Sequence, residues 1–513
     1  MSPAGRDRSR GFIRRPTADE LIDVGRREFL SLGRAEAELY AEIVGGILGQ
    51  LDTLDALDVP AAVPSHARVR DLGGPPAAAD NPHNTFLHRC RIEGSGTGPL
   101  AGMRAAVKDN IAVARVPTTN GARLTAHAPT ADAVVVERLL DAGADLVGKL
   151  NMDDFGSGGT GETSAFGPAR NPLDPARSPG GSSGGTGAAV AAGEVEVGLA
   201  VDQGGSGRVP ASFCGVVALK ATQGLIPSHG VTHMDHTLDC VSPTAKTVAL
   251  CATIADVVSG HDDRDPQWVR AAPEPTRCAD ALGLGVEGLR IGIVPQASGA
   301  DRCEPAVLRG LDAAAGALTA AGAEIVEAPI ALWTDSWPIG LALWIQLGWA
   351  MVQSEGQGYG HLGEVDESAV RAFALSRRHE ADELPPFMKV WLLAGRYLHE
   401  RYLSQYLARA QNLRRELRRQ VTAAFGGCDL LLMPTTTMVA PELLTGPAAD
   451  DEIMDRAFTG ANTAPLNVSG HPALAVPSGI DEDSGMPTSV QLVAPHFEDA
   501  RTFRAGAVIE ASR

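Results

Sequence analysis

Two glycine-rich segments hold serine side chains at fixed places between glycines. The first is Gly180–Gly187, with Ser182 near its centre, and the second is Asp202–Gly205, which Ser206 follows. Glycines permit backbone conformations that other residues avoid, and they let main-chain N–H groups converge. Together with Lys108, which ends a short apolar run, these serines could supply a nucleophile, a proton relay and a base without histidine. Two flexible Gly/Ser turns would leave the same pattern, so these segments alone decide nothing.

Three other patterns resemble ligand sites. Gly143–Leu150 nearly matches a phosphate-binding loop, but a leucine stands where that loop needs a hydroxyl for magnesium. Gly156–Gly161 fits Gly-x-Gly-x-x-Gly, yet a mostly polar segment precedes it instead of a strand. His229, His233 and His236 lie in a polar, turn-rich segment with no helical spacing to align them on a metal. We therefore expect no nucleotide, no metal and no cofactor.

Hydrophobic periodicity places the candidate residues in an α/β domain. A strand at 100–107 leads to Lys108, and a helix at 132–142 and a strand at 145–148 complete a unit typical of a parallel sheet. Other strands are expected at 196–201, 289–293, 324–326, 430–433, 474–476 and 489–493, and other helices at 188–192, 306–321 and within 337–425.

The chain is expected to have three parts. Residues 1–16 are interpreted as a loose basic tail, residues 17–78 as a helical N-terminal extension with a linker, and residues 79–513 as the catalytic domain. Thr17 followed by Glu20 resembles a helix capping box, and apolar residues then recur at helical spacing.

Charge and cysteine usage restrict the partners and the cellular compartment that we expect for the protein. The formal net charge is −18, which repels phosphate backbones, so we expect no nucleic-acid partner. A basic run at Arg414, Arg415, Arg418 and Arg419 is interpreted as the solvated face of a helix. Seven cysteines without paired spacing indicate a reducing compartment, and no apolar stretch is long enough for a membrane span. These features favour a cytoplasmic protein without a membrane partner.

Matched motifs spread over residues 80–505 resemble the amidase signature family. The 24-residue step from Ser182 to Ser206 and the position of Lys108 belong to this resemblance. Further matching stretches are Gly148–Asp153, Ser164–Gly167, Arg170–Pro172, Pro210–Gly215, Leu238-Asp239 with Pro243, Met433–Thr435, Asn462–Pro465 and Gly470–Pro472. The resemblance implies a central mixed, mostly parallel sheet flanked by helices, with a helical N-terminal extension. Some stretches are similar to bacterial small-amide amidases and others to the A subunit of glutamyl-tRNA amidotransferase.

The resemblance also implies a role for each residue of the site. Ser206 is the nucleophile, Ser182 is the relay in a cis-peptide geometry, and Lys108 is the base, whose pKa burial would lower. The backbone N–H groups of Gln203, Gly204, Gly205 and Ser206 would hold the oxyanion. The supporting residues are Ser183, Asp202 and Arg208, the last two as an ion pair. One departure is Gly207, which replaces a branched residue and could widen the pocket.

Three functions share this chemistry. The first is a hydrolase of linear carboxylic amides, with a small-molecule amide and, as an option, a second copy of the chain as its partners. The second is a glutaminase-type subunit of an amidotransferase. The third is an acyltransferase in which an amine replaces water at the acyl-enzyme. The hydrolase is the leading hypothesis, because the net charge of −18 and the motif at Gln203 count against the glutaminase-type subunit. Sequence alone does not separate the hydrolase from the acyltransferase, because both use the same residues of the site.

Overall fold

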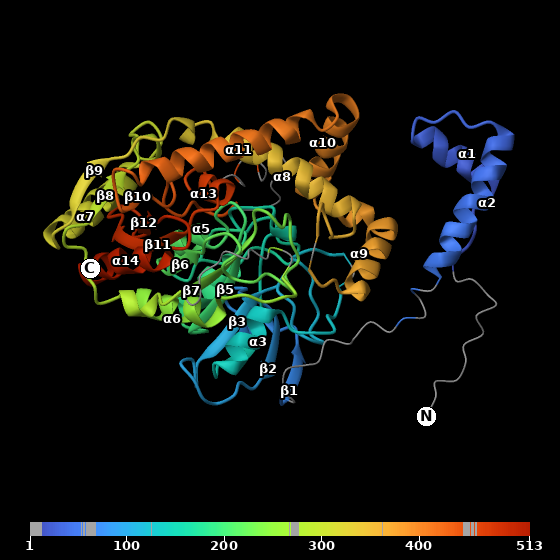
Figure 1. Cartoon of the computed structure of the whole chain (residues 1–513). Coiled ribbons are helices and arrows are strands. Elements are labelled where there is room, and N and C mark those ends of the chain that lie inside the picture. The colour runs from blue at the N-terminus through green and yellow to red at the C-terminus, as the bar shows by residue number, and fades with distance from the viewer. Residues whose placement is uncertain are drawn as a thin grey trace. The chain divides into compact units, whose positions relative to one another are not determined.

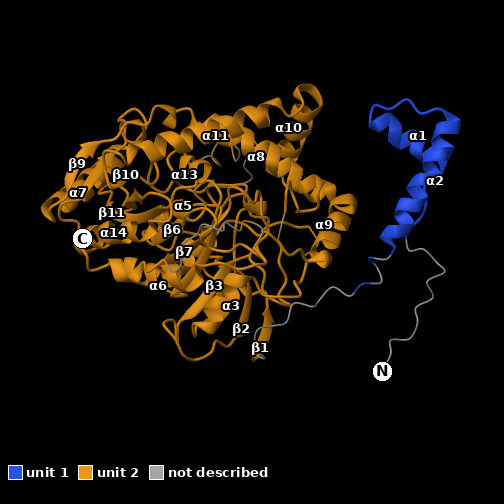
Figure 2. Cartoon of the chain, in the orientation of Figure 1, with its two compact units in different colours: residues 1–63 blue, residues 64–513 orange. Residues whose placement is uncertain are grey.

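The computed structural model describes residues 13–52, 54, 57, 68–124, 126–265, 267, 276–361, 363–444, 452, 456 and 459–513. The chain divides into two compact units, residues 1–63 and residues 64–513 (Figure 2). All the residues singled out for chemistry belong to the larger unit.

The smaller unit is helical, as the sequence predicted. It contains α1 (Ala18–Arg27) and α2 (Arg34–Leu51), which pack against each other. The Thr17 side chain accepts the Glu20 N–H and the Glu20 side chain accepts the Thr17 N–H, so the predicted capping box is present. Residues 1–12 of the expected basic tail lie outside the described residues.

The larger unit is built on a sheet in which the described residues form twelve strands (Figure 1). In spatial order the strands are β1 (Arg70–Gly74), β2 (Phe86–Ile92), β4 (Asp145–Leu150), β3 (Arg104–Lys108), β5 (Val197–Asp202), β7 (Cys240–Ala245), β6 (Val217–Lys220), β11 (Ala473–Ile480), β12 (Pro487–Val493), β10 (Leu430–Pro434), β8 (Arg290–Ile293) and β9 (Glu324–Glu327). Since β1 pairs with β2, the stretch expected to be linker up to residue 78 contains a strand of this sheet.

The α/β fold with a mixed sheet is confirmed, but the sheet is not mostly parallel. Parallel pairs join β3 to β4, β3 to β5, β8 to β9 and β8 to β10, whereas the other seven pairs of described strands are antiparallel. The β-α-β units found from periodicity do give parallel neighbours. Strands without a clear periodic signal, such as β6 and β7, give antiparallel neighbours.

Helices cover both faces of the sheet. In the larger unit they are α3 (Val134–Asp141), α4 (Gly184–Ala192), α5 (Arg208–Cys214), α6 (Val248–Val258), α7 (Pro305–Ala320), α8 (Ser336–Gln353), α9 (Glu367–His379), α10 (Pro386–Tyr402), α11 (Gln405–Ala424), α13 (Ala464–Ser469) and α14 (Asp499–Ala511). One face packs with α3, α6, α7 and α14 in the largest apolar core. The opposite face packs with α4 and α5, and with α8, α11 and α13. Helices α8, α10 and α11 contact one another (Figure 1).

The alternation of side chains along β3 and β4 places Lys108 and Lys149 on opposite faces of the sheet. On β3, Ala105 and Val107 belong to the largest core, while Ala106 belongs to the core under α4 and α5. Successive side chains of a strand point to opposite faces, so Lys108 shares the face of Ala106. Lys149 on β4 is paired with Val107 and shares the other face. Two neighbouring strands thus carry fully buried lysines on opposite sides of the sheet.

Two further properties concern the whole larger unit. Within the described ranges, no helix is long and apolar enough to cross a membrane. All seven cysteines are buried and free, so packing and hydrogen bonds hold this fold without a disulfide.

Candidate active site

Lys108 ends β3 on the face that carries α4. Its Nζ donates to Ser182 Oγ at 2.7 Å and to the Val201 carbonyl at 3.3 Å. The side chain is fully buried, and burial lowers the pKa of this ammonium to about 8, although Asp153, among nearby carboxylates, opposes the shift. No ion pair of the described residues includes Lys108. A lysine in this state can lose its proton near neutral pH, as the sequence predicted.

The chain reaches Ser182 through a turn that only glycine fits. The Gly181–Ser182 peptide bond is cis, as the family resemblance implied. A Cβ on Gly181 would lie 2.0 Å from Asp153 Oδ2, so any larger residue would displace this carboxylate. The same carboxylate accepts the N–H groups of Gly161 at 3.1 Å and Thr163 at 3.0 Å. Asp153 therefore ties the Gly156–Gly161 segment to the turn that presents Ser182.

Asp202 organises the loop that carries Ser206. Its carboxylate accepts the Gly205 N–H at 2.8 Å and forms a fully buried ion pair with Arg208 at 2.9 Å. Burial would raise the pKa of Asp202, but the charge and hydrogen bonds of Arg208 outweigh that effect and hold the pKa at about 2. Arg208 also donates to Asn467 Oδ1 and Gln491 Oε1, which fixes the loop against α13 and β12. The ion pair predicted from the sequence is present.

The hydrogen bond from the Gly205 N–H to Asp202 changes the expected oxyanion hole. Because the Gly205 N–H is donated to Asp202, it does not point to a substrate. Among the described residues, no protein acceptor takes the N–H groups of Gln203, Gly204 and Ser206, and these three remain for an oxyanion. Gly205 contributes conformation instead: its φ is +130°, and a Cβ there would lie 2.1 Å from Thr463 Oγ1.

Ser183 holds the two serine loops together. Its N–H donates to the Ser206 carbonyl at 3.2 Å, and its hydroxyl donates to the Val201 carbonyl at 3.3 Å. Val201 O is also the second acceptor of Lys108. Ser183 thus links the end of β5, the loop that carries Ser206 and the carbonyl that accepts from Lys108.

Gly207 does not widen the pocket. A Cβ at this position would lie 2.2 Å from Ser242 Oγ and 2.7 Å from Ser242 Cβ, on neighbouring strand β7. Gly207 is also absent from the pocket wall, so Ser242 fills the space that a branched side chain would occupy. The expectation that Gly207 widens the pocket is therefore wrong.

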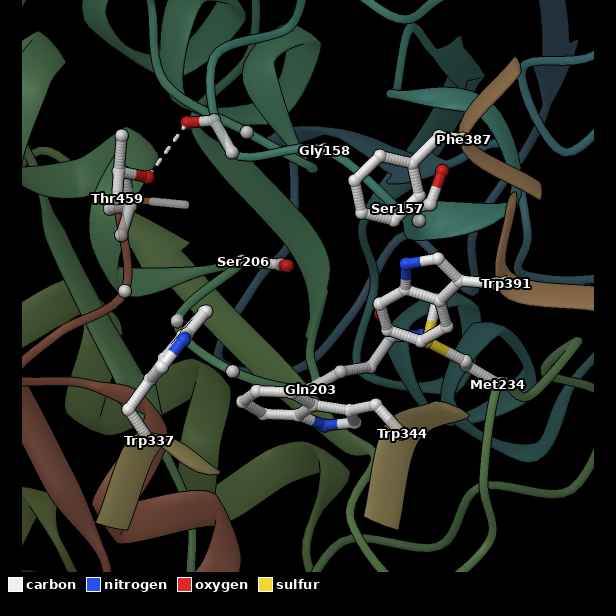
Figure 3. A pocket seen from close by; sticks show the side chains of 17 residues that line it. Ser157, Gly158, Gln203, Ser206, Met234, Trp337, Trp344, Phe387, Trp391 and Thr459 are labelled. Atoms are coloured by element: carbon white, nitrogen blue, oxygen red, sulfur yellow. Dashed lines mark hydrogen bonds between the residues drawn. The ribbon is translucent and has the colours of Figure 1, made fainter. Parts of the chain in front are cut away.

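A pocket of about 500 Å³, including its open mouth, lies over Ser206. Figure 3 shows the Ser206 hydroxyl facing the middle of this pocket, with large apolar side chains around it. The wall is formed by Gly156, Ser157, Gly158, Gly159, Gly181, Gln203, Gly204, Gly205, Ser206, Val209, Met234, Trp337, Trp344, Phe387, Trp391, Thr459 and Gly460. Of Lys108, Ser182 and Ser206, only Ser206 lines it, whereas Lys108 and Ser182 are fully buried.

The other sequence patterns have structural roles. Most of Gly143–Leu150 is strand β4, and Gly156–Gly161 forms part of the pocket wall. The rings of His233 and His236 have centroids 4.4 Å apart and planes tilted by 55°, and His236 also contacts His361. In the part of the chain that is described, no three His, Cys, Asp or Glu side chains are arranged to hold a metal.

Sequence reasoning missed part of the pocket wall. Core packing is the default expectation for a tryptophan, but Trp344 and Trp391 line the pocket. Nothing in the sequence singled out Trp337, Phe387 and Met234, which also line it. The available signal was spacing, since the two residues on α8 are seven positions apart and the two on α10 are four apart. Which face of each helix meets the sheet was not readable from spacing.

Comparison with known proteins assigns the family. The Amidase family model matches residues 86–503. The chain belongs to the amidase signature family. It is 39% identical over 430 residues to the A subunit of glutamyl-tRNA(Gln) amidotransferase from Natronomonas pharaonis, in a match that covers 83% of this chain and 99% of the relative.

Solved structures agree with this assignment. The structure of the A subunit of the same amidotransferase from Thermotoga maritima has 29% identity and a TM-score of 0.67, and covers 84% of this chain and 88% of that one. A structure from a vestigial protein complex, described as revealing the origins of an s-triazine catabolic enzyme, has 33% identity and a TM-score of 0.66. That match covers 81% of this chain and 85% of the other.

These relatives overturn the expected partners. The sequence predicted a small-molecule amide, an optional second copy and no nucleic acid, but the relatives are subunits of an amidotransferase named for a tRNA. The prediction was wrong because a net charge of −18 is an average over the surface. It excludes neither a partner protein nor a local face for nucleic acid.

Proposed function

We propose that the protein is an amidase that cleaves a carboxylic amide through an acyl-enzyme on Ser206. The observation that carries this proposal is the 2.7 Å contact of a buried lysine of lowered pKa with Ser182, whose neighbour Ser183 donates its N–H to the carbonyl of the pocket serine, Ser206. A neutral Lys108 accepts the Ser182 proton while Ser182 accepts the Ser206 proton. Ser206 Oγ then bonds to the carbonyl carbon.

The remaining steps return every proton. The oxyanion lies against the N–H groups of Gln203, Gly204 and Ser206. The C–N bond breaks as the lysine proton passes back through Ser182 to the leaving nitrogen, which departs as ammonia or an amine. Water repeats the cycle at the ester, releases the carboxylic acid and restores the Ser206 hydroxyl.

The test replaces the nucleophile and a matched serine of the same pocket wall. We expect Ser206→Ala to lower kcat for amide hydrolysis about 10⁴-fold or more, because the acyl-enzyme cannot form. Ser157→Ala is the control, since the Ser157 hydroxyl donates to Asp154, and we expect less than a tenfold change. Hydroxylamine should trap the acyl group as a hydroxamate with wild type only. An active Ser206→Ala variant, or hydroxamate formed by it, would refute the proposal.

The relatives favour a second candidate function. The chain spans nearly the whole length of the A subunit of an amidotransferase at 39% identity, so it could cleave glutamine and deliver ammonia within a larger tRNA-dependent enzyme. This candidate predicts that the full chain purifies with partner proteins and releases ammonia from glutamine only in that complex. Equal glutamine turnover with and without the partners would count against it.

A further inference from the structure

The pocket over Ser206 is built from two aromatic pairs. Trp337 and Trp344 lie on α8 with ring centroids 5.5 Å apart, and Phe387 and Trp391 lie on α10 with centroids 5.2 Å apart. Helices α8 and α10 pack against each other, so the rings are held in place before any ligand binds. Figure 3 shows the two pairs around the nucleophile, with Met234 beside Trp391.

Several polar side chains of the wall have protein partners, whereas the buried Gln203 Oε1 and Trp344 Nε1 have none among the described contacts. Ser157 Oγ donates to the Asp154 carbonyl at 2.6 Å, and Thr459 Oγ1 donates to the Gly159 carbonyl at 3.1 Å. Gln203 Nε2 donates to Asp239 at 3.4 Å. Ser206, the free N–H groups beside it, Gln203 Oε1 and Trp344 Nε1 are therefore the polar groups that the described residues of the wall leave available to a substrate, and all of them are uncharged.

Within the described residues, no ionisable side chain lines this pocket. Asp239 accepts hydrogen bonds from the Met234 N–H at 2.8 Å and from Gln203 Nε2 at 3.4 Å, but it is not part of the wall. An ammonium or carboxylate placed among the rings would lose its water without gaining a partner, which is strongly unfavourable. An apolar group would gain contact with up to four rings.

We propose that the site selects amides whose acyl group is aromatic or otherwise apolar and uncharged, and that it discriminates against free glutamine. The proposal rests on the proposed function, since it names the acyl group that Ser206 receives. It assigns specificity to Trp337, Trp344, Phe387 and Trp391. The amino-acid head of glutamine carries two charges for which the described residues of this wall offer no ionisable partner.

The experiment uses primary amides, because ammonia is then the leaving group and only the acyl group fills the pocket. The purified full chain is assayed for ammonia release from 3-phenylpropanamide and from L-phenylalaninamide, which adds only an ammonium group. Pentanamide and L-glutamine form a second pair that differs in the charged head. We expect kcat/KM to be about 100-fold or more higher for the uncharged member of each pair, and 3-phenylpropanamide to exceed propanamide.

Variants test the ring wall directly. Trp391→Leu is expected to lower the 3-phenylpropanamide-to-propanamide ratio of kcat/KM about tenfold, mainly through KM. The half-buried Trp337 gives a second variant, Trp337→Leu, with less risk to folding. The matched control is Trp349→Leu, a buried tryptophan of α8 that stacks on His399 outside the pocket. A ratio is unaffected by the folded fraction, so this control should leave it unchanged.

The outcomes separate the two proposals. Glutamine turnover equal to or faster than that of pentanamide, or an unchanged ratio in both pocket variants, overturns the proposed substrate class while leaving cleavage at Ser206 intact. No turnover of any amide, together with no labelling of Ser206 by a fluorophosphonate, overturns the proposed function and this inference with it.

Discussion

The ends of the neighbouring strands β3 and β4 carry two lysines that are equally buried and differently partnered. Lys108 touches a hydroxyl and a carbonyl, whereas Lys149 lies 3.4 Å from the Asp109 carboxylate and donates to Thr118 Oγ1 at 2.8 Å. Burial lowers the pKa of both ammonium groups, and the Asp109 charge opposes this effect at Lys149. Burial alone therefore does not decide whether a lysine can act as a catalytic base. What distinguishes Lys108 is that none of the described carboxylates forms an ion pair with it and that it contacts a hydroxyl, which can give up a proton.

The strongest test of this contrast is removal of the candidate base. We expect Lys108→Met to lower kcat/KM about 10³- to 10⁴-fold, because no group accepts the Ser182 proton. The same change should raise stability at pH 7 by about 1–3 kcal/mol, since the fold no longer holds a desolvated ammonium. Single-turnover assays and urea unfolding measure the two effects. Activity within tenfold of wild type would remove Lys108 from the mechanism.

The opposite result is expected for the second lysine. Lys149→Met leaves the buried Asp109 carboxylate without its counter-ion, which should cost about 3–5 kcal/mol of unfolding free energy. Adding Asp109→Asn should recover part of this loss, because the uncompensated charge is then absent. Urea unfolding of the single and double variants measures the coupling. If Lys149→Met were as stable as Lys108→Met, the proposed contrast would fail.

The pH dependence of the wild type gives a third test. Since Lys108 must be neutral to accept a proton and its pKa is lowered to about 8, activity should rise with pH. We expect kcat/KM for an uncharged amide to increase about tenfold per unit from pH 6 to 7 and to level off above about pH 8. The stability contribution has the same sign, because between about pH 8 and the ordinary lysine pKa the unfolded chain binds more protons than the folded chain. A flat rate profile from pH 6 to 9 would argue against a titrating base.

A third buried lysine gives the smallest expected effect. Lys220 on β6 donates to the Ala221 carbonyl at 2.9 Å, contacts no serine, and lies near Asp202 and Asp499 without an ion pair to either among the described contacts. Loss of desolvation and loss of these attractions oppose each other, so Lys220→Met should change the unfolding free energy by about 1 kcal/mol or less. Its kcat should stay within tenfold of wild type. A larger fall in kcat would show that burial on this face of the sheet is itself sufficient for a catalytic contribution.

Local sequence patterns predicted several strands and the glycine-rich loops that follow them. The β-α-β spacing predicted β3, α3 and β4, but β3 begins at Arg104 instead of residue 100, and β4 continues to Leu150 instead of ending at residue 148. Strands β1, β2, β6 and β7 were not found, because each is short or lacks the flanking signals that mark a strand. Their antiparallel pairings, which are non-local, make the sheet different from the expected one.

The residues of the candidate site also fall into those that local sequence predicted and those that it did not. Spacing and family resemblance placed Lys108, Ser182 and Ser206, and the structure brings Lys108 and Ser182 into contact. They did not show that Asp202 takes the Gly205 N–H, since that depends on the conformation of one loop. Nor did they show that Trp344 and Trp391 face the pocket, because the packing angle of α8 against α10 decides it. Roles set by local sequence were predictable, and roles set by long-range packing were not.

Gly207 and Ser242 show what this packing means for anyone who exchanges segments between family members. A side chain at position 207 would need the space that the Ser242 side chain fills. The two residues are 35 positions apart in the sequence and lie on different elements. Grafting a branched residue at 207 alone would force overlap with Ser242, at a cost of about 1–3 kcal/mol. A chimaera of this protein should therefore inherit both positions from the same parent.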